Sequence, residues 1–295
     1  MLNRMLKAAI VALSTLALAS CLTGGGSVHG VNLAITDAPV DMATSIPISF
    51  SQIQLSSSDP NVTPFTLDIA PASSIDMYQL QGGIAATIIT AMQAQPGHYT
   101  DLRITIAADV NSAQSSISLP DGLHVLYVPP GVSPQVNIPV DFDLSSGGDI
   151  NLTVDFDLRK SIIQDPNDPT KYQLIPSMRA VQNELSGSIT GSVATRLITC
   201  LTPAVYVYPG NVTPTDENIN APAGQVQPIT TALVGLNQTS ANSNVTAGFL
   251  PAGPYTVAFT CQATQDLANQ ANNITFTSVT HAIVSNGNTT FVTLQ

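Results

Sequence analysis

The stretch VDFDLSSGGDINLTVDFDL, residues 140–158, has the letters VDFDL at both ends of a polar, glycine-containing segment. Side chains alternate between the two faces of a β-strand. In both copies the apolar residues fall on even positions, and aspartates fall on 141, 143, 155 and 157. Residues 136–144 and 150–158 are therefore predicted to be strands, each with one apolar and one polar face.

The two strands are expected to pair as an antiparallel hairpin, and parity limits the register. A two-residue turn at 147–148 would place the two apolar sets on opposite sides of the sheet, so it is rejected. A five-residue loop sets Asp141 opposite Thr153, whereas a three-residue loop sets Asp141 opposite Asp155. The five-residue loop is favoured because opposed like charges destabilise a sheet, and the aspartates are then expected to line a solvated face.

A calcium site is an alternative only for the three-residue loop, where a cation between Asp141 and Asp155 could offset their repulsion. Calcium takes six to eight oxygen ligands, usually from a bent loop rather than from a flat sheet. We therefore expect no cofactor, and Asp141 and Asp155 remain weak candidate metal ligands.

Residues 1–20 have the features of a lipoprotein signal peptide. Two cations precede an apolar run at residues 8–19, which is too short to cross a bilayer as a helix. The run ends in Leu-Ala-Ser-Cys at 18–21, which resembles a lipobox, where the cysteine thiol receives a diacylglycerol. We therefore expect Cys21 to carry lipid and residues 21–30 to form a flexible tether. In lipoproteins that this N-terminus resembles, a residue other than aspartate after the cysteine goes with the outer membrane, so Leu22 implies the outer membrane of a bacterial cell envelope.

The formal charge of −11 restricts the possible partners. An acidic surface repels nucleic acid and anionic lipid, so neither is expected to bind directly. The expected partners are the membrane, through the lipid anchor, and a glycan or another envelope protein.

With Cys21 assigned to lipid, Cys200 and Cys261 remain. Two cysteines in an exported domain favour a disulfide over two buried thiols.

Short alternating runs separated by proline, glycine, asparagine and aspartate predict an all-β protein. We expect two β-sandwich domains, at residues 31–185 and 186–295. The phase of alternation changes near Ser51-Gln52, which predicts a β-bulge. One crossover helix is expected at about 83–94, because apolar residues there have helical spacing. These residues are Ile84, Ile88, Ile89 and Met92.

Few residues suggest catalysis. The histidines, at 29, 98, 124 and 281, have no metal-ligand spacing, and His124 is expected on the polar face of its strand. Arg159-Lys160 is expected to form a surface salt bridge to Asp155 or Asp157. The tyrosines available for stacking on a sugar are Tyr127, Tyr206 and Tyr208.

These observations favour a non-catalytic, lipid-anchored envelope protein that acts as a binding or structural module. One alternative is calcium-assisted adhesion or glycan binding through the acidic strands. The other is a hydrolase whose site is assembled from distant strands, since a catalytic triad is not local in sequence.

Four segments occur in an order that resembles a family of bacterial lipoproteins known as domain of unknown function 4382. They are TDAPVD (36–41), IDMYQLQGG (75–83), QPGHYTDLRI (95–104) and VDFDLRKS (154–161), followed by residues 172–181. The resemblance covers about residues 30–185 and implies a β-sandwich in the cell envelope, but no reaction or catalytic residues.

Three later segments resemble carboxypeptidase regulatory-like and transthyretin-like sandwiches. They are GSITGSV (187–193), AVYVYPG (204–210) and FLPAGPYTVAFTCQA (249–263). This resemblance implies a second β-sandwich from residue 186 onward.

Overall fold

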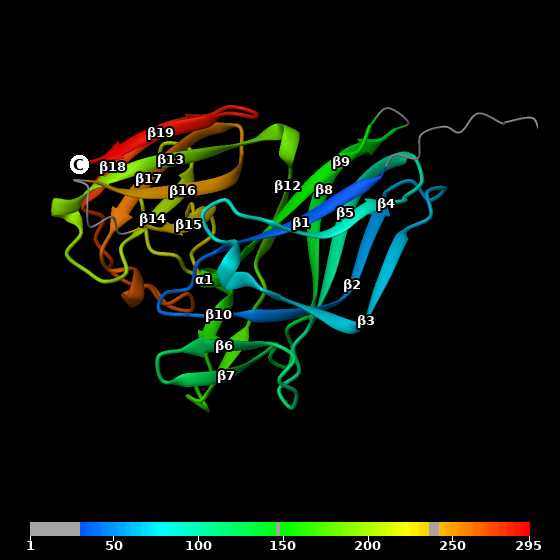
Figure 1. Ribbon diagram of the computed structural model, residues 1–295, viewed down its shortest axis with the longest axis horizontal. Helices are drawn as coiled ribbons and strands as arrows, with labels where there is room; N and C mark the ends of the chain where they lie inside the picture. The colour runs from blue at the N-terminus through cyan, green and yellow to red at the C-terminus, as the bar shows by residue number, and fades with distance from the viewer. Residues whose placement is uncertain (1–29, 146–147, 236–241) are drawn as a thin grey trace, which may run out of the picture.

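Figure 1 shows the computed structural model of the protein, which describes residues 30–145, 148–235 and 242–295. Strands dominate it, so the all-β prediction is confirmed. The predicted signal peptide, Cys21 and most of the tether lie outside the described residues. No helix in the described ranges has the length and apolar character needed to span a membrane.

Two four-stranded sheets form the N-terminal sandwich. The inner sheet contains, in spatial order, β12 (Met178–Gln182), β9 (Ile150–Asp157), β1 (Val31–Ala38) and β4 (Ala86–Met92). The outer sheet contains β3 (Phe65–Asp76), β2 (Pro47–Ser57), β5 (Gly97–Ala107) and β8 (Gln135–Leu144). The inner sheet lies between the outer sheet and the C-terminal strands (Figure 1).

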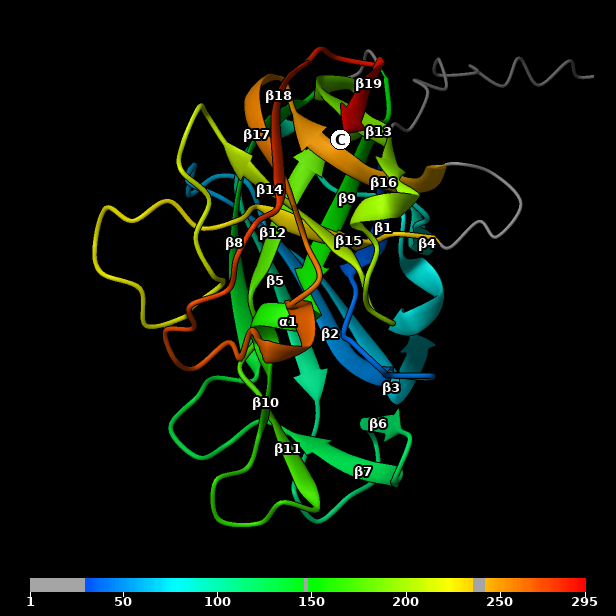
Figure 2. The ribbon, with the colours of Figure 1, turned by 90° about the vertical axis from the view of Figure 1, so that its left-hand side faces the viewer.

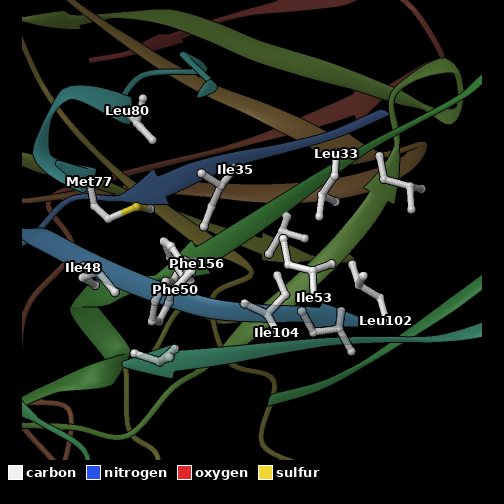
Figure 3. Packing of buried hydrophobic residues seen from close by; sticks show 14 of the residues in the cluster. Leu33, Ile35, Ile48, Phe50, Ile53, Met77, Leu80, Leu102, Ile104 and Phe156 are labelled. Carbon is white, nitrogen blue, oxygen red and sulfur yellow. The ribbon is translucent and has the colours of Figure 1, made fainter. Parts of the chain in front are cut away.

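The core of this sandwich is made of side chains from both sheets. Figure 3 shows Leu33, Ile35 and Phe156 of the inner sheet packed against Phe50 and Ile104 of the outer sheet. All five are almost fully buried. Burying a side chain of this size contributes about 1.5–3 kcal/mol, so this interface dominates the stability of the sandwich.

A third sheet projects from one end of the N-terminal sandwich, and we call it the tip sheet (Figure 2). It contains, in spatial order, β10 (Ile162–Gln164), β11 (Lys171–Leu174), β7 (Gly122–Tyr127) and β6 (Ser116–Leu119). A single turn of helix, α1 (Leu158–Ser161), connects β9 to β10. Short 3-10 turns are η1 (Met77–Leu80) and η2 (Asn183–Leu185).

The C-terminal sandwich has its own hydrophobic core, built from residues between 189 and 294. One sheet contains β16 (Asn242–Pro251), β13 (Ser186–Ala194) and β19 (Thr289–Leu294). The other contains β15 (Thr230–Leu233), β14 (Ala204–Pro209), β17 (Gly253–Thr260) and β18 (Ser278–Val284). Two 3-10 turns, η3 (Thr195–Leu197) and η4 (Ala263–Gln265), flank them, and Cys200 and Cys261 form the predicted disulfide.

The predicted hairpin of the two VDFDL copies is wrong. β8 pairs with β5 in the outer sheet, whereas β9 pairs with β1 and β12 in the inner sheet. Neither the five-residue nor the three-residue register therefore exists. The predicted alternation is confirmed, since Phe142 and Phe156 both point into the core. Alternation defines the apolar face of a strand, but it does not identify the strand beside it.

The predicted helix at 83–94 is also wrong, because β4 occupies residues 86–92 and pairs antiparallel with β1. Short apolar runs fit either periodicity. Here the β-branched residues at 87–90 favour a strand. Met92 is buried as expected, but Ile84 is 58% exposed. The predicted bulge in β2 is confirmed by a register shift between Phe50 and Gln52.

Candidate functional site

The inner sheet has one face in the N-terminal core and one face that points away from it. The C-terminal sandwich covers this second face, which is polar. On β9 the odd-numbered residues Thr153, Asp155 and Asp157 point away from the core, yet each is less than 10% exposed. The expectation that these aspartates line a solvated face is therefore wrong for β9. On β8 it holds, because the Asp141 and Asp143 side chains are 90% and 81% exposed.

Arg179 on β12 joins this polar face to the C-terminal sandwich. It stands opposite Asp155 in the sheet, and its Nη2 donates to Asp155 Oδ2 at 2.5 Å. Its Nη1 donates to the carbonyl of Phe249 on β16 at 2.8 Å. Burial raises the pKa of Asp155, and the Arg179 charge opposes that shift. Arg179 thus neutralises a buried carboxylate and connects the two sandwiches across their contact, which we call the junction.

Arg159 on α1 is the second arginine whose side chain contacts both sandwiches. Its guanidinium donates to both carboxylate oxygens of Asp41, at 2.6 and 2.7 Å. It also donates at 3.2 Å to the Ala263 carbonyl and to Thr231 Oγ1, and it lies 5.7 Å from the centre of the Tyr206 ring. The predicted surface salt bridge of Arg159 to Asp155 or Asp157 is wrong, because its side chain is 4% exposed and bound to Asp41.

Two further carboxyl groups lie at the junction without a compensating cation of their own. Asp37 is 5% exposed and Glu217 is 1% exposed. The partner of Asp37 is the backbone N–H of Leu158, and the partner of Glu217 is the carboxyl group of Asp157. Burial is the main cause that raises the pKa of both well above its usual range, and nearby Asp157 adds to it in each case. Both are therefore favoured in the neutral form.

A cleft of about 640 Å³ opens beside this junction, between the tip sheet and residues 263–270 of the C-terminal sandwich. The register of the tip sheet places Ile117, Ile162 and Tyr172 on one face, and this face forms the floor. Met42 and Leu267 belong to the walls, and they are 54% and 51% exposed. The cleft is therefore largely apolar.

Four acidic or basic side chains line the cleft, namely Asp41, Asp121, Arg159 and Asp266. Asp41 and Arg159 are paired with one another. Asp121 is at the rim, 72% exposed, and its Oδ1 lies 2.9 Å from Nε2 of His124. The polar groups are thus few and mostly acidic.

The prediction that His124 faces the polar side of its strand is wrong. His124 is 9% exposed, with Nδ1 3.0 Å from the Thr170 carbonyl, whereas its neighbour Leu123 is 70% exposed. The bond to Asp121 is the main cause that raises the pKa of His124 and lowers that of Asp121. The Asp121–His124 pair stabilises the β6–β7 turn at the rim of the cleft.

The tyrosines expected to stack on a sugar are not accessible. Tyr206 and Tyr208 are fully buried, and Tyr127 is 6% exposed, with its hydroxyl donating to Asp165. The tyrosine that lines the cleft is Tyr172, which no pattern in the sequence marks as a site residue. Asp41, Asp266 and residues 263–270 were also missed, because only the contact between the two sandwiches brings them together.

The two candidate metal ligands do not meet. Asp141 is on the outer sheet, 3.6 Å from His98, whereas Asp155 is on the inner sheet and bound to Arg179. Within residues 30–145, 148–235 and 242–295, no group of three or more histidine, cysteine, aspartate or glutamate side chains could hold a metal ion.

Three solved structures illustrate what this chain is similar to. The minor pilin GBS52 of Streptococcus agalactiae is 9% identical, with 90% of this chain and 94% of that chain covered, at a TM-score of 0.20. The major pilin of Streptococcus pyogenes is 11% identical, with coverage of 90% and 98% and a TM-score of 0.20. The fimbrial anchor protein Mfa2 of Porphyromonas gingivalis is 9% identical, with coverage of 80% and 80% and a TM-score of 0.19. Scores this low carry no argument about fold or function.

No curated protein matches the chain. A family model does match, over residues 30–176, and its description is "Domain of unknown function (DUF4382)". The match spans the strands from β1 to β11, so it includes the floor of the cleft and both Asp41 and Arg159. Residues 30–176 therefore match the DUF4382 family, as the order of the four segments predicted.

Proposed function

We propose that the protein is a non-catalytic, lipid-anchored module of the bacterial cell envelope that binds a ligand in the junction cleft. The observation that carries this proposal is the cleft itself, with a volume of about 640 Å³, apolar walls and four acidic or basic side chains. Binding sites for small molecules typically have a volume of about 300–1,000 Å³, mostly apolar walls and a few polar groups.

The arrangement of the buried acids supports binding rather than hydrolysis. A glycosidase needs two carboxyl groups on either side of the bond that it cleaves. Asp157 and Glu217 approach one another at the junction, but they are only 7% and 1% exposed, so a substrate does not reach them. The described histidines contact aspartates, a carbonyl, or the Thr256 hydroxyl, which itself donates to the Gly210 carbonyl.

The lipid anchor is supported by the sequence at Cys21. To test the anchor, cells that produce the full chain are grown with a radiolabelled fatty acid, and their inner and outer membranes are then separated. We expect label on the wild-type protein in the outer membrane and none on the Cys21→Ala variant. Label retained by that variant would contradict the anchor.

Ligand binding can be followed with a tryptophan introduced into the cleft, because the chain contains none. Leu267→Trp places the reporter in the cleft wall, and Leu201→Trp, at a residue that is 91% exposed and outside the cleft lining, is the matched control. The probe is N-phenyl-1-naphthylamine, a neutral apolar dye that accepts energy from tryptophan. We expect saturable energy transfer in the first variant and little in the second. Equal transfer, or none in either variant, would refute the binding site.

A further inference from the structure

We infer that the ligand of the junction cleft is an extended, uncharged polypeptide segment, which adds as a further strand to the free edge of β10. The inference rests on the proposed function, because it assigns a chemical class to the ligand of the same cleft. It follows from the unpaired backbone groups of β10, from the apolar floor beside them and from the pairing of the charged side chains in the lining.

β10 is the last strand of the tip sheet, and in the described part of the chain it pairs only with β11 (Figure 2). The Ser161 carbonyl, just before β10, and the Asp165 N–H, just after it, bond to the backbone on the β11 side at 2.8 and 3.0 Å. In an antiparallel pair the backbone groups of alternate residues face the neighbouring strand. The backbone groups of Ile162 and Gln164 therefore face away from β11.

Three backbone groups are unpaired at this edge, namely the Ile162 carbonyl and the N–H and carbonyl of Gln164. The Ile162 N–H is not among them, because it donates to the Leu158 carbonyl at the end of α1. No backbone group within residues 30–145, 148–235 and 242–295 bonds to the other three. Donors and acceptors in such a row are a template for pairing with another chain.

The opposite edge of the tip sheet, β6, is covered. The Thr44 N–H donates to the Ser118 carbonyl, and the Ser118 N–H donates to the Ser45 carbonyl, both at 2.9 Å. The segment between β1 and β2 thus satisfies one edge of the sheet. β10 is the edge that stays open to a partner.

The free edge of β10 opens into the junction cleft. Ile162 and Gln164 lie on the face that forms the floor, whereas Ile163 points to the other face, and yet all three line the cleft. The cleft therefore passes around the edge of the strand. A strand added there would place alternate side chains on the apolar floor, beside Ile117 and Tyr172.

The charged side chains of the lining have partners, so an uncharged segment fits best. Arg159 is bonded to Asp41, and Asp121 lies 2.9 Å from His124. The carboxyl group of Asp266 is hydrogen-bonded within the C-terminal sandwich. A charged ligand would have to displace one of these partners, whereas backbone amides and apolar side chains need none of them.

Strand addition divides recognition between two sets of groups. Hydrogen bonds from the main chain of the segment to β10 supply affinity for any sequence, and the surface under alternate side chains supplies selectivity. The expected segment therefore alternates apolar residues, which lie on the floor, with uncharged polar residues.

The test uses a six-residue peptide with blocked termini that alternates valine and threonine. It is titrated against the full chain carrying Leu267→Trp and loaded with N-phenyl-1-naphthylamine. We expect saturable displacement of the dye. Dye binding without displacement overturns the ligand class, while the dye signal still supports a binding site. Absence of dye binding refutes the proposed function, and the inference with it.

Two N-methylated peptides test the edge itself on the same protein. One carries a methyl group on every valine amide, and the other carries one on every threonine amide. Alternate N–H groups of a strand point to opposite edges, so a strand added to β10 uses only one of the two sets. We expect one methylated peptide to bind at least about tenfold more weakly than the parent and the other to bind like the parent. Equal affinity of the two methylated peptides overturns the inference.

Gln164→Pro removes the unpaired N–H of β10, and it leaves the ladder to β11 intact because that N–H faces away from it. We expect unchanged dye binding and a loss of peptide affinity of about fivefold. Gln164→Ala is the matched control, because it removes the same side chain and keeps the N–H, and it should bind the peptide normally. Equal peptide affinity of the two variants overturns the inference. If Gln164→Pro does not fold, the methylated peptides decide the question.

Discussion

Arg179 and Asp155 stand opposite one another on β12 and β9, and their 2.5 Å contact lies at the boundary of two sandwiches. Asp155 is 3% exposed, so its charge depends on this partner. Removing one member of a buried pair costs about 3–5 kcal/mol, because the other charge remains buried without compensation. We therefore expect Arg179→Met to lower the free energy of unfolding by this amount in urea titrations.

The matched control is Arg103→Met. Arg103 pairs with Asp101 at 2.7 Å, but its side chain is 39% exposed, and pairs of that kind contribute about 0–1 kcal/mol. The double variant Asp155→Asn/Arg179→Met should recover part of the loss. Equal destabilisation by Arg179→Met and Arg103→Met would show that the junction pair has no special role.

Gly83 and Gly248 form a close backbone approach between the loop before β4 and the C-terminal sandwich. A Cβ at Gly248 would lie 2.8 Å from the Gly83 Cα, which is closer than carbon atoms can pack. Because the obstacle is backbone, relief requires the sandwiches to shift, and overpacking of this kind costs about 1–3 kcal/mol. Gly248→Ala should therefore lower the urea midpoint.

Gly148→Ala serves as the comparison for Gly248→Ala, because a Cβ at Gly148 meets nothing within 4 Å. It should leave the midpoint unchanged within error. If both variants unfold at the wild-type midpoint, the sandwiches do not pack as closely in solution as these two glycines indicate.

Much of the N-terminal sandwich could be predicted from the alternation of residues 136–158. The pattern identifies both strands and their inward residues, since burial requires one apolar face. It could not identify their partners, because β9 pairs in parallel with β1, and the side chains of Asn32 and Asn151 that meet there are 119 residues apart. A hairpin is the simplest local pairing of two such strands, but in the sandwich each strand pairs with strands that are distant in the sequence.

The cleft was less predictable than the fold. The sequence marks Asp155 and Asp157 as acids on one face of a strand, but a polar side chain on a strand fits a solvated face and a polar junction equally well. The distinguishing signal was the presence of Arg159 and Arg179 in a chain with eight lysines and arginines. Their partners, Asp41, Ala263 and Phe249, belong to three separate segments, and no local pattern connects these segments.

The disulfide between Cys200 and Cys261 should be a major contribution to the C-terminal sandwich. It joins residues 61 apart, and closing a loop of this length removes entropy worth about 4 kcal/mol from the unfolded chain. The double variant Cys200→Ser/Cys261→Ser should lose about this much stability in urea titrations. Reduction of the wild-type protein should give the same loss and leave the variant unaffected. A loss below about 1 kcal/mol in both experiments would contradict the assignment.

Glu217 should make the protein less stable as the pH rises. Its pKa is raised by burial and by Asp157, so the folded state keeps a proton that the unfolded chain releases above its ordinary pKa. Stability from this group is complete below about pH 4.5 and declines as the pH rises from there towards the folded-state pKa. Urea titrations of the wild type between pH 5 and 8 should show this decline.

Glu217→Gln removes the titrating group and should reduce that slope by about one proton, while Asp37, whose pKa is raised in the same direction, maintains the remainder. Glu184→Gln is the matched control, because the carboxylate is exposed and accepts a bond from Asn151. It should keep the wild-type slope. If Glu217→Gln also kept that slope, Glu217 would be ionised in the folded protein, and a cation at the junction would be required to balance it.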